Sequence, residues 1–274
     1  MEQQKQKCVV TSAESKSTGK RKVTVGSVWD SKNCGKFEVV EQKGCWDVKV
    51  RFVETGFCAQ TSSQEVKIGA IKDKLKPSVY GIGFIGDGRF KSSLGNKGTR
   101  AYNLWKRMLA RCYDNKTQEK RPTYVGCTVC EEWHNFQNFA EWYEENYPKD
   151  GCDYHLDKDL KILGNREYSP DGCMFVSPMV NTFISDASAA RGEFMIGVCW
   201  HKRSKKLIAQ CRDPITGGQK YLGSFLSEIE AHLAWRQRKS DLAIEVIKKQ
   251  NNKDVKEALI RWKSALDGNL IHTY

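Results

Sequence analysis

The stretch MIGVCWHKRSKKLIAQCRDPITGGQKYLGSF, residues 195–225, decides the fold of the C-terminal third of the chain. It contains three short runs of strand-forming residues, at 195–202, 206–212 and 219–225. Turns rich in Ser, Lys, Pro and Gly separate these runs. Runs bounded in this way indicate β-strands. A helical pattern follows over 227–249, where Ser227 and Glu230 have the spacing of a capping box. The region is therefore predicted to form three strands followed by a long helix.

The second of these strands combines two different faces. Alternation places Gln210 and Arg212 on one face, and Ala209 and Cys211 on the opposite face. A two- or three-stranded ribbon fits the major groove of DNA, where Gln pairs with adenine and Arg with guanine through two hydrogen bonds each. Double-stranded DNA is therefore the expected partner. The alternative is a sheet-and-helix domain that binds a protein or only stabilises the chain.

Four segments of this region keep the order and spacing of a known DNA-binding module: Ile196-Gly197-Val198, residues 206–213, Tyr221-Leu222-Gly223-Ser224-Phe225 and residues 230–234. Residues 191–250 resemble the APETALA/ethylene-response-factor DNA-binding domain. The resemblance implies that a three-stranded sheet lies in the major groove while the helix packs on its other face. By position, it implies base contacts from six residues: Cys199, His201, Gln210, Arg212, Gln219 and Tyr221.

Basic residues around these positions are interpreted as contacts to phosphates, which position a protein without specifying sequence. They are Lys202, Arg203, Lys205 and Lys220. The family usually has Arg where Cys199 and Gln219 stand, so no base preference is carried over to this chain.

The middle of the chain carries a second resemblance. It rests on residues 124–133, on His155-Leu156-Asp157-Lys158-Asp159, on residues 168–176 and on Asn181. These segments resemble phage proteins related to HNH homing endonucleases, in which an HNH domain precedes a reader of the type described above. Residues 99–190 are therefore expected to form an HNH-like domain with a strand–loop–strand–helix finger. The resemblance implies phosphodiester hydrolysis with Mg²⁺ or a similar divalent ion.

The resemblance assigns catalytic places to four residues of this finger. Asp157 and Asn181 take the metal-binding places, and Lys158 stands where the family has its general-base His. Lys is a poor base unless burial strongly lowers its pKa. His155 is two residues before Asp157 on the same strand face, so it is the candidate substitute base. Asn165 is a candidate for the Asn of the family's loop.

Cys127-x-x-Cys130 has the spacing of a zinc-binding pair, and Cys152, His155 or Cys173 are candidates to complete it. The alternative interpretation is that both cysteines are buried thiols, because apolar residues flank them.

The N-terminal part is predicted to be a disordered tail over 1–20 and a small β-barrel of the Src-homology-three or KOW type over 21–76. The barrel rests on short alternating runs at 23–25, 37–40, 46–52 and 65–68. Gly and Ser residues over 77–98 indicate a linker. Helices are expected at 100–113 and 135–147, and a short basic helix within the C-terminal segment 251–274.

The chain as a whole is predicted to be an α+β protein. Its formal net charge is +12, which fits either nucleic-acid binding or a solvated surface. We expect no membrane segment, because no apolar run of about 18 residues occurs, and no small-molecule substrate. Eleven cysteines in an odd, scattered set indicate reduced thiols and a cytoplasmic protein, in a bacterial host if the gene belongs to a phage.

Three functions follow from these patterns. The first is a homing-type DNA endonuclease or nickase, and the second is a catalytically inactive DNA-binding regulator or host-interaction factor. The third is an RNA- or protein-binding factor that acts through the N-terminal barrel. The target site and the oligomeric state stay open.

Overall fold

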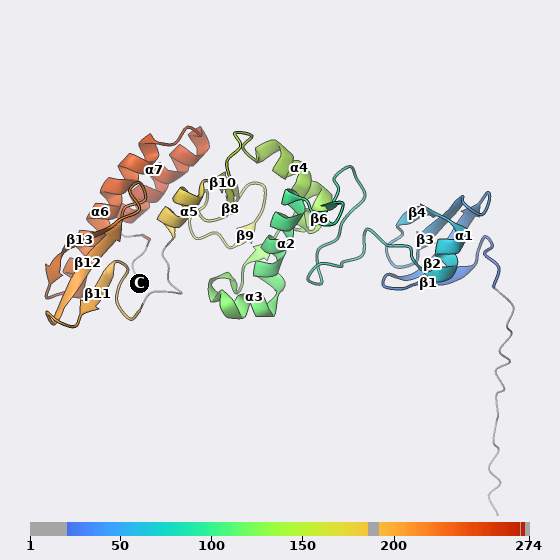
Figure 1. The fold of residues 1–274 in the computed structure, drawn as a ribbon, viewed down its shortest axis with the longest axis horizontal. Helices are drawn as coiled ribbons and strands as arrows, with labels where there is room; N and C mark the ends of the chain where they lie inside the picture. Colours follow the sequence, from blue (N-terminus) through green and yellow to red (C-terminus); the bar gives the residue numbers. More distant parts are fainter. Residues whose placement is uncertain (1–20, 186–191, 269, 272–274) are drawn as a thin grey trace, which may run out of the picture. The chain divides into compact units, whose positions relative to one another are not determined.

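The computed structural model describes residues 21–185, 192–268 and 270–271. The chain divides into two compact units, one ending at Asp73 and the other beginning at Lys74 (Figure 1). Both units combine strands with helices, which confirms the α+β class. No helix in the described ranges is long and apolar enough to cross a membrane.

The first unit is an antiparallel sheet with one short helix. Its strands pair in the order β1 (Val28–Ser31), β2 (Gly35–Gln42), β3 (Val48–Phe52) and β4 (Cys58–Thr61), and α1 (Ser63–Ile68) follows. The sheet buries Phe37, Val39, Val48, Val50 and Phe52. Within the described residues β1 and β4 do not pair, so the sheet is open and the predicted barrel is wrong.

The barrel fails because two of its predicted strands have other conformations. Residues 65–68 belong to α1, which begins at a complete capping box: the Ser62 side chain accepts from the Glu65 N–H, and the Glu65 side chain accepts from the Ser62 N–H. Residues 23–25 lead into a turn at Gly26, whose φ of 81° favours glycine. Neither segment is therefore available as a strand that could close the sheet.

The predicted linker over 77–98 is instead part of the second unit. Phe84 pairs with Asn135 in an isolated bridge, and the Phe136 N–H donates to the Phe84 carbonyl at 2.9 Å. Farther along, β5 (Ser93–Leu94) and β6 (Lys97–Gly98) form a small hairpin. The glycines of this segment therefore serve turns that pack on neighbouring elements.

The central part of the second unit surrounds an aromatic core. Helix α2 (Arg100–Tyr113) is followed directly by α3 (Asn115–Lys120), and short 3₁₀ turns at Pro122–Tyr124 and Glu131–His134 lie between α3 and α4 (Phe136–Asn146). The core consists mainly of aromatic and sulfur-containing side chains, among them Trp105, Trp133, Phe136, Phe139 and Cys173. Beside this core, β7 (Thr128–Val129) pairs in parallel with β9 (Glu167–Tyr168).

A strand–loop–strand–helix arrangement follows, as expected for the finger within residues 99–190. Strand β8 (His155–Asp157) pairs antiparallel with β10 (Met174–Val176), and α5 (Pro178–Ile184) begins directly afterwards. The Ser177 hydroxyl caps α5 by accepting from the Val180 N–H at 3.2 Å.

The C-terminal part contains the three predicted strands and the long helix. Strands β11 (Val198–His201), β12 (Lys206–Arg212) and β13 (Gln219–Phe225) form an antiparallel sheet in that order. Helix α6 (Glu228–Lys248) packs on the sheet, and α7 (Lys253–Asp267) packs on α6. One hydrophobic core contains side chains from β10, α5, β12, α6 and α7, so the predicted segments 99–190, 191–250 and 251–274 share it.

One local expectation for this part is wrong. Ser227 is the N-cap of α6, but its side chain makes no capping hydrogen bond. Trp200 is 48% exposed because it lies on the outer strand β11, whereas Trp235 of α6 is buried.

Candidate nucleic-acid interface

The register of the C-terminal sheet gathers the six expected base-contacting residues on one face. Directly opposed residues on neighbouring strands lie on the same face of a sheet. The pairs are Cys199 with Ile208, His201 with Lys206, Gln210 with Tyr221, and Arg212 with Gln219. Because Ile208, Gln210 and Arg212 alternate along β12, all four pairs point the same way. The opposite face carries Ala209 and Cys211, which α6 buries.

A β-bulge in β13 keeps this face continuous. The pairing passes from Ala209–Gly223 to Gln210–Tyr221, so Leu222 is an extra residue with no direct partner. Gly223 accommodates the bulge with a φ of 142°. The bulge also puts Tyr221 and Ser224 on the same face, where their hydroxyl oxygens are 2.6 Å apart.

The six expected base-contacting side chains on this face are at least partly accessible and carry hydrogen-bonding groups, whereas Ile208 on the same face is buried. Cys199, His201, Arg212, Gln219 and Tyr221 are exposed, and Gln210 is half-buried. The amide nitrogen of Gln219 lies 3.4 Å from the amide oxygen of Gln210, so the two amides orient each other. The face therefore offers amide, guanidinium, imidazole and phenol groups side by side.

His201 is oriented by the turn that follows it. Its Nδ1 accepts from the Ser204 N–H at 3.3 Å and lies 2.7 Å from the Ser204 hydroxyl. In the neutral ring the proton then resides on Nε2, which becomes a donor. The Lys205 N–H closes the turn on the His201 carbonyl at 2.9 Å, and Lys205 has a φ of 52°.

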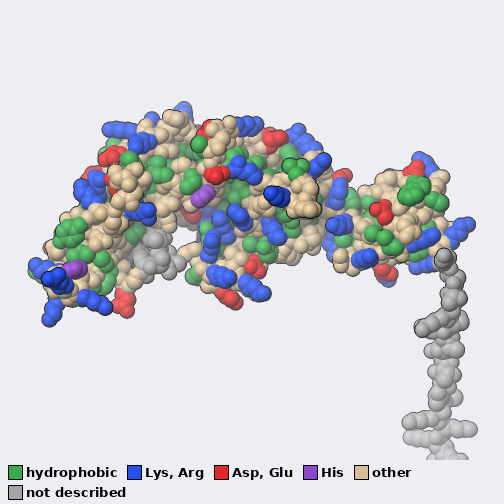
Figure 2. Space-filling model, viewed as in Figure 1, with side chains coloured by type: hydrophobic (Ala, Val, Ile, Leu, Met, Phe, Trp, Pro, Cys, Tyr) green, Lys and Arg blue, Asp and Glu red, His purple; other side chains and the backbone are tan. Residues whose placement is uncertain are grey.

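The four expected phosphate-contacting residues divide into two groups. Lys202, Arg203 and Lys205 are exposed together in the turn between β11 and β12. Lys220 is exposed too, but it pairs with the buried Cys211 and therefore points to the side that α6 covers. Figure 2 shows Lys and Arg side chains gathered at this turn and over α2 and α3.

The finger places its predicted catalytic residues in different surroundings. His155 is exposed at the start of β8, whereas the Asp157 carboxyl is buried. The Oδ1 of Asp157 accepts from the N–H groups of Asp159 at 3.0 Å and Leu160 at 2.7 Å, so it shapes the turn after β8. Burial raises the pKa of Asp157 to about 6. This carboxyl is turned inward and is less acidic than a typical metal ligand.

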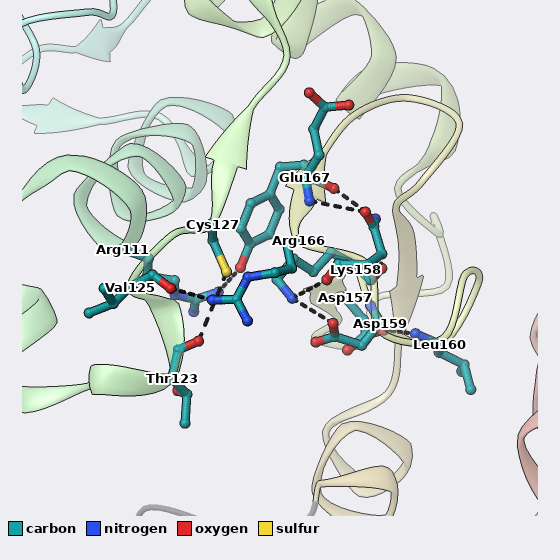
Figure 3. A network of polar contacts seen from close by, with 12 residues as sticks. Arg111, Thr123, Val125, Cys127, Asp157, Lys158, Asp159, Leu160, Arg166 and Glu167 are labelled. Atoms are coloured by element: carbon teal, nitrogen blue, oxygen red, sulfur yellow. Dashed lines mark hydrogen bonds and ion pairs between the residues drawn. The ribbon is translucent and has the colours of Figure 1, made fainter. Parts of the chain in front are cut away.

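Lys158 is buried, and its amine is held in place (Figure 3). Its Nζ donates to the Asp159 carboxylate and, at 2.7 Å, to the Asn165 carbonyl. The Asn165 amide in turn donates to the carbonyls of Lys158 at 3.0 Å and Glu167 at 2.8 Å. Lys158 and Asn165 therefore fix the loop between β8 and β9. A buried amine with these two acceptors is not placed to take a proton from water.

Asn181 lies half-buried on α5, which contacts β8. Among the described residues, no group of three or more His, Cys, Asp and Glu side chains is arranged to hold a metal ion.

Two arginines beside the finger were not indicated by the sequence. Arg111 of α2 donates to the Tyr168 hydroxyl at 3.4 Å and stacks on Tyr124, with 5.2 Å to the ring centroid. Arg166 donates to the Val125 carbonyl, as Figure 3 shows. Their contacts join segments 41 to 57 residues apart, and no local spacing reveals such contacts.

The cysteine pair is part of the central core. Cys127 is buried, and its thiol points to the Thr123 carbonyl at 3.9 Å. Cys130 is half-buried, and burial raises its pKa, which disfavours the thiolate that binds zinc. This environment matches the buried-thiol interpretation of the pair more closely than the zinc interpretation.

Comparison with known proteins adds no relative to these observations: no family model, no curated protein and no solved structure matches the chain.

Proposed function

We propose that the protein binds double-stranded DNA in the cytoplasm and reads it with the face of β11, β12 and β13 that α6 leaves uncovered. The observation that carries this proposal is the strand register, which puts six spaced polar side chains on one exposed face. A ribbon of this kind matches the width of the major groove, and its Gln and Arg side chains match the exposed edges of adenine and guanine.

The charge around the face supports the same partner. Three cationic side chains in the turn between β11 and β12 lie at the end of the face, where they meet the phosphates beside the groove. The formal net charge of +12 also favours a polyanion and predicts binding that weakens steeply with salt.

The test uses the full chain and a duplex selected from a random library. Arg212→Ala is expected to lose about 1–3 kcal/mol of discrimination at one base pair, because Arg212 supplies a two-bond contact. Arg203→Ala is the matched control, because it also removes one arginine charge, but from the turn between β11 and β12. It should weaken binding to all sequences alike and lower the salt slope by about one. Unchanged sequence preference in Arg212→Ala would overturn the proposal.

A metal-dependent endonuclease is the second candidate function. It is supported by the strand–loop–strand–helix order of β8, β10 and α5 and by the exposed imidazole of His155. The buried Lys158 and the inward-turned Asp157 favour a catalytically inactive DNA-binding regulator instead.

Plasmid cleavage with Mg²⁺ or Mn²⁺ distinguishes the two candidates. We expect no cleavage by the unmodified chain. If cleavage occurs, two variants test whether the finger is the active site. His155→Ala removes an exposed imidazole. Asp157→Asn removes the charge but keeps an acceptor for the turn. Metal-dependent cutting that disappears in both variants would establish the nuclease and reject the inactive regulator.

A further inference from the structure

A pocket of about 510 Å³ opens in the second unit. Its walls are the 89–94 loop, the first turn of α2, and α4 with the residues directly after it. Its volume lies within the range of about 300–1,000 Å³ that is typical of small-molecule sites. None of the expected DNA-reading or catalytic residues lines it.

Aromatic rings form one side of this pocket. Tyr143 and Tyr147, one helical turn apart, stack with ring centroids 4.8 Å apart and an interplanar angle of 26°. Phe90 lines the pocket from the 89–94 loop, and all three rings are only half-buried. The pocket therefore has partly exposed aromatic rings in its wall, and the Arg89 guanidinium lies 4.7 Å from the centroid of the Phe90 ring.

Four cationic side chains also line the pocket: Arg89, Lys91, Arg100 and Lys149. The lining contains one acidic residue, Glu144, and Arg89 pairs with it at 3.0 Å. Arg100 pairs with Asp153 and lies over the Tyr147 ring at 5.1 Å. Lys91 and Lys149 are exposed, and within the described residues neither has an ion pair.

The first turn of α2 adds partial positive charge to the same wall. Thr99, the N-cap, and the next two residues line the pocket. The first amides of a helix have no acceptor within the helix and point outward, which favours a bound phosphate. Together with the two lysines, this wall suits an anion of phosphate type.

Internal hydrogen bonds hold the wall in place without a ligand. The buried Gln137 amide accepts from the Phe90 N–H at 2.9 Å and donates to the carbonyls of Phe90 at 3.0 Å and Ile85 at 3.2 Å. The Thr99 hydroxyl donates to the Lys91 carbonyl at 3.1 Å. A wall ordered in advance loses less conformational entropy when it binds a ligand.

We propose that this pocket binds one nucleotide, with the base against the aromatic rings and the phosphate at Lys91, Lys149 and the first turn of α2. A nucleotide joins a flat π system to an anion, and the pocket offers the complement of both within one cavity. The ligand is either a free nucleotide or an unstacked nucleotide of a DNA strand. The site is separate from the duplex-reading sheet and does not depend on it.

Calorimetric titration of the full chain with deoxyadenosine 5′-monophosphate tests the proposal. A titration with deoxyribose 5-phosphate measures how much the base contributes to the affinity. The nucleotide is expected to bind at least about tenfold more tightly than the sugar phosphate, because stacking on aromatic rings is lost without a base. No binding of the nucleotide, or equal binding of the two ligands, would overturn the proposal.

Paired lysine variants locate the binding. Lys91→Ala/Lys149→Ala should weaken nucleotide binding about tenfold, whereas Lys106→Ala/Lys116→Ala removes two exposed lysines outside the pocket and should leave it unchanged. Equal effects of the two double variants would place the nucleotide elsewhere and reject the pocket.

Single-stranded tetradeoxyadenylate separates the two sources of the ligand. Tighter binding than the mononucleotide, lost in Lys91→Ala/Lys149→Ala, would assign the pocket to a DNA strand, and equal binding would assign it to a free nucleotide. Site preference on duplex DNA should persist in both double variants, so this result is independent of the Arg212→Ala result.

Discussion

At the scale of single residues, Lys239 is a charged side chain that is buried beside the C-terminal core. It is buried on α6, with its amine 4.1 Å from the centroid of the Phe183 ring and 5.7 Å from that of Trp235. These rings favour the ammonium form. Burial nevertheless lowers the pKa of Lys239 to about 8, and the neighbouring Cys211 opposes this shift.

Lys239→Met should therefore raise the free energy of unfolding at pH 7 by about 1–3 kcal/mol. The unfolded chain holds the lysine proton more tightly than the folded chain, so wild-type stability from this group rises between about pH 8 and pH 10.5. The advantage of the variant should shrink over the same interval. Urea unfolding at pH 7 and pH 10 measures both effects, with the exposed Lys106→Met as the control. An advantage that does not change with pH would contradict the assignment.

At the scale of elements, Gly197 sets how closely α6 approaches β11. It has a φ of 82°, and an added Cβ would lie 2.0 Å from the Cγ of Trp235. Gly217, in the turn between β12 and β13, has a similar φ of 75° but open space around it. Substitutions at the two glycines therefore distinguish the cost of backbone strain from the cost of a steric clash.

Gly197→Ala should lower the free energy of unfolding by about 2–5 kcal/mol, because strain and overpacking add. Gly217→Ala should lower it by about 1 kcal/mol, because strain acts alone. Thermal unfolding of the two variants provides the comparison. Equal losses would mean that Trp235 moves aside freely and that the helix does not fix the sheet.

Element boundaries were predictable where the local pattern and the tertiary environment agree. The bounds of α2, β12 and β13 coincide with those read from periodicity. Residues 65–68 alternate like a strand, yet the capping box at Ser62 and Glu65 makes them helical. That signal was present in the sequence and indicated the correct structure. The segment 77–98 is ordered by hydrogen bonds from α4, which no local pattern reveals.

Some features of the candidate site could likewise be predicted from local pattern, and others could not. Alternation along one strand was enough to place Gln210 and Arg212 on a common face. The burial of Lys158 depends on Asn165, seven residues away, and on the Tyr168 ring 6.0 Å from its amine. The nucleotide pocket draws on residues from Arg89 to Lys149, so only the fold brings its lysines and rings together.

At the scale of the whole molecule, the C-terminal module does not end where its resemblance ends. The expected boundary at residue 250 separates α6 from α7, yet both helices contribute to one core. Helix α7 buries six side chains: Val255, Ala258, Leu259, Trp262, Ala265 and Leu266. The Trp262 ring lies 5.5 Å from the Phe183 ring of α5, so α7 also joins the finger to the module.

A chain of residues 74–250 should therefore fail to fold, whereas residues 74–274 should fold as the second unit does in the full chain. Removing one large core side chain typically costs about 2–5 kcal/mol. Deleting α7 removes three such side chains, Leu259, Trp262 and Leu266, and exposes the α6 surface beneath them. The combined loss is as large as the net stability of about 5–15 kcal/mol of a typical domain. Circular dichroism with thermal melting compares the two chains. Trp262→Ala in residues 74–274 is a milder change, and it should lower the free energy of unfolding by about 3–5 kcal/mol. If residues 74–250 melted cooperatively at the same temperature as residues 74–274, α7 would be an appendage and the module would indeed end at residue 250.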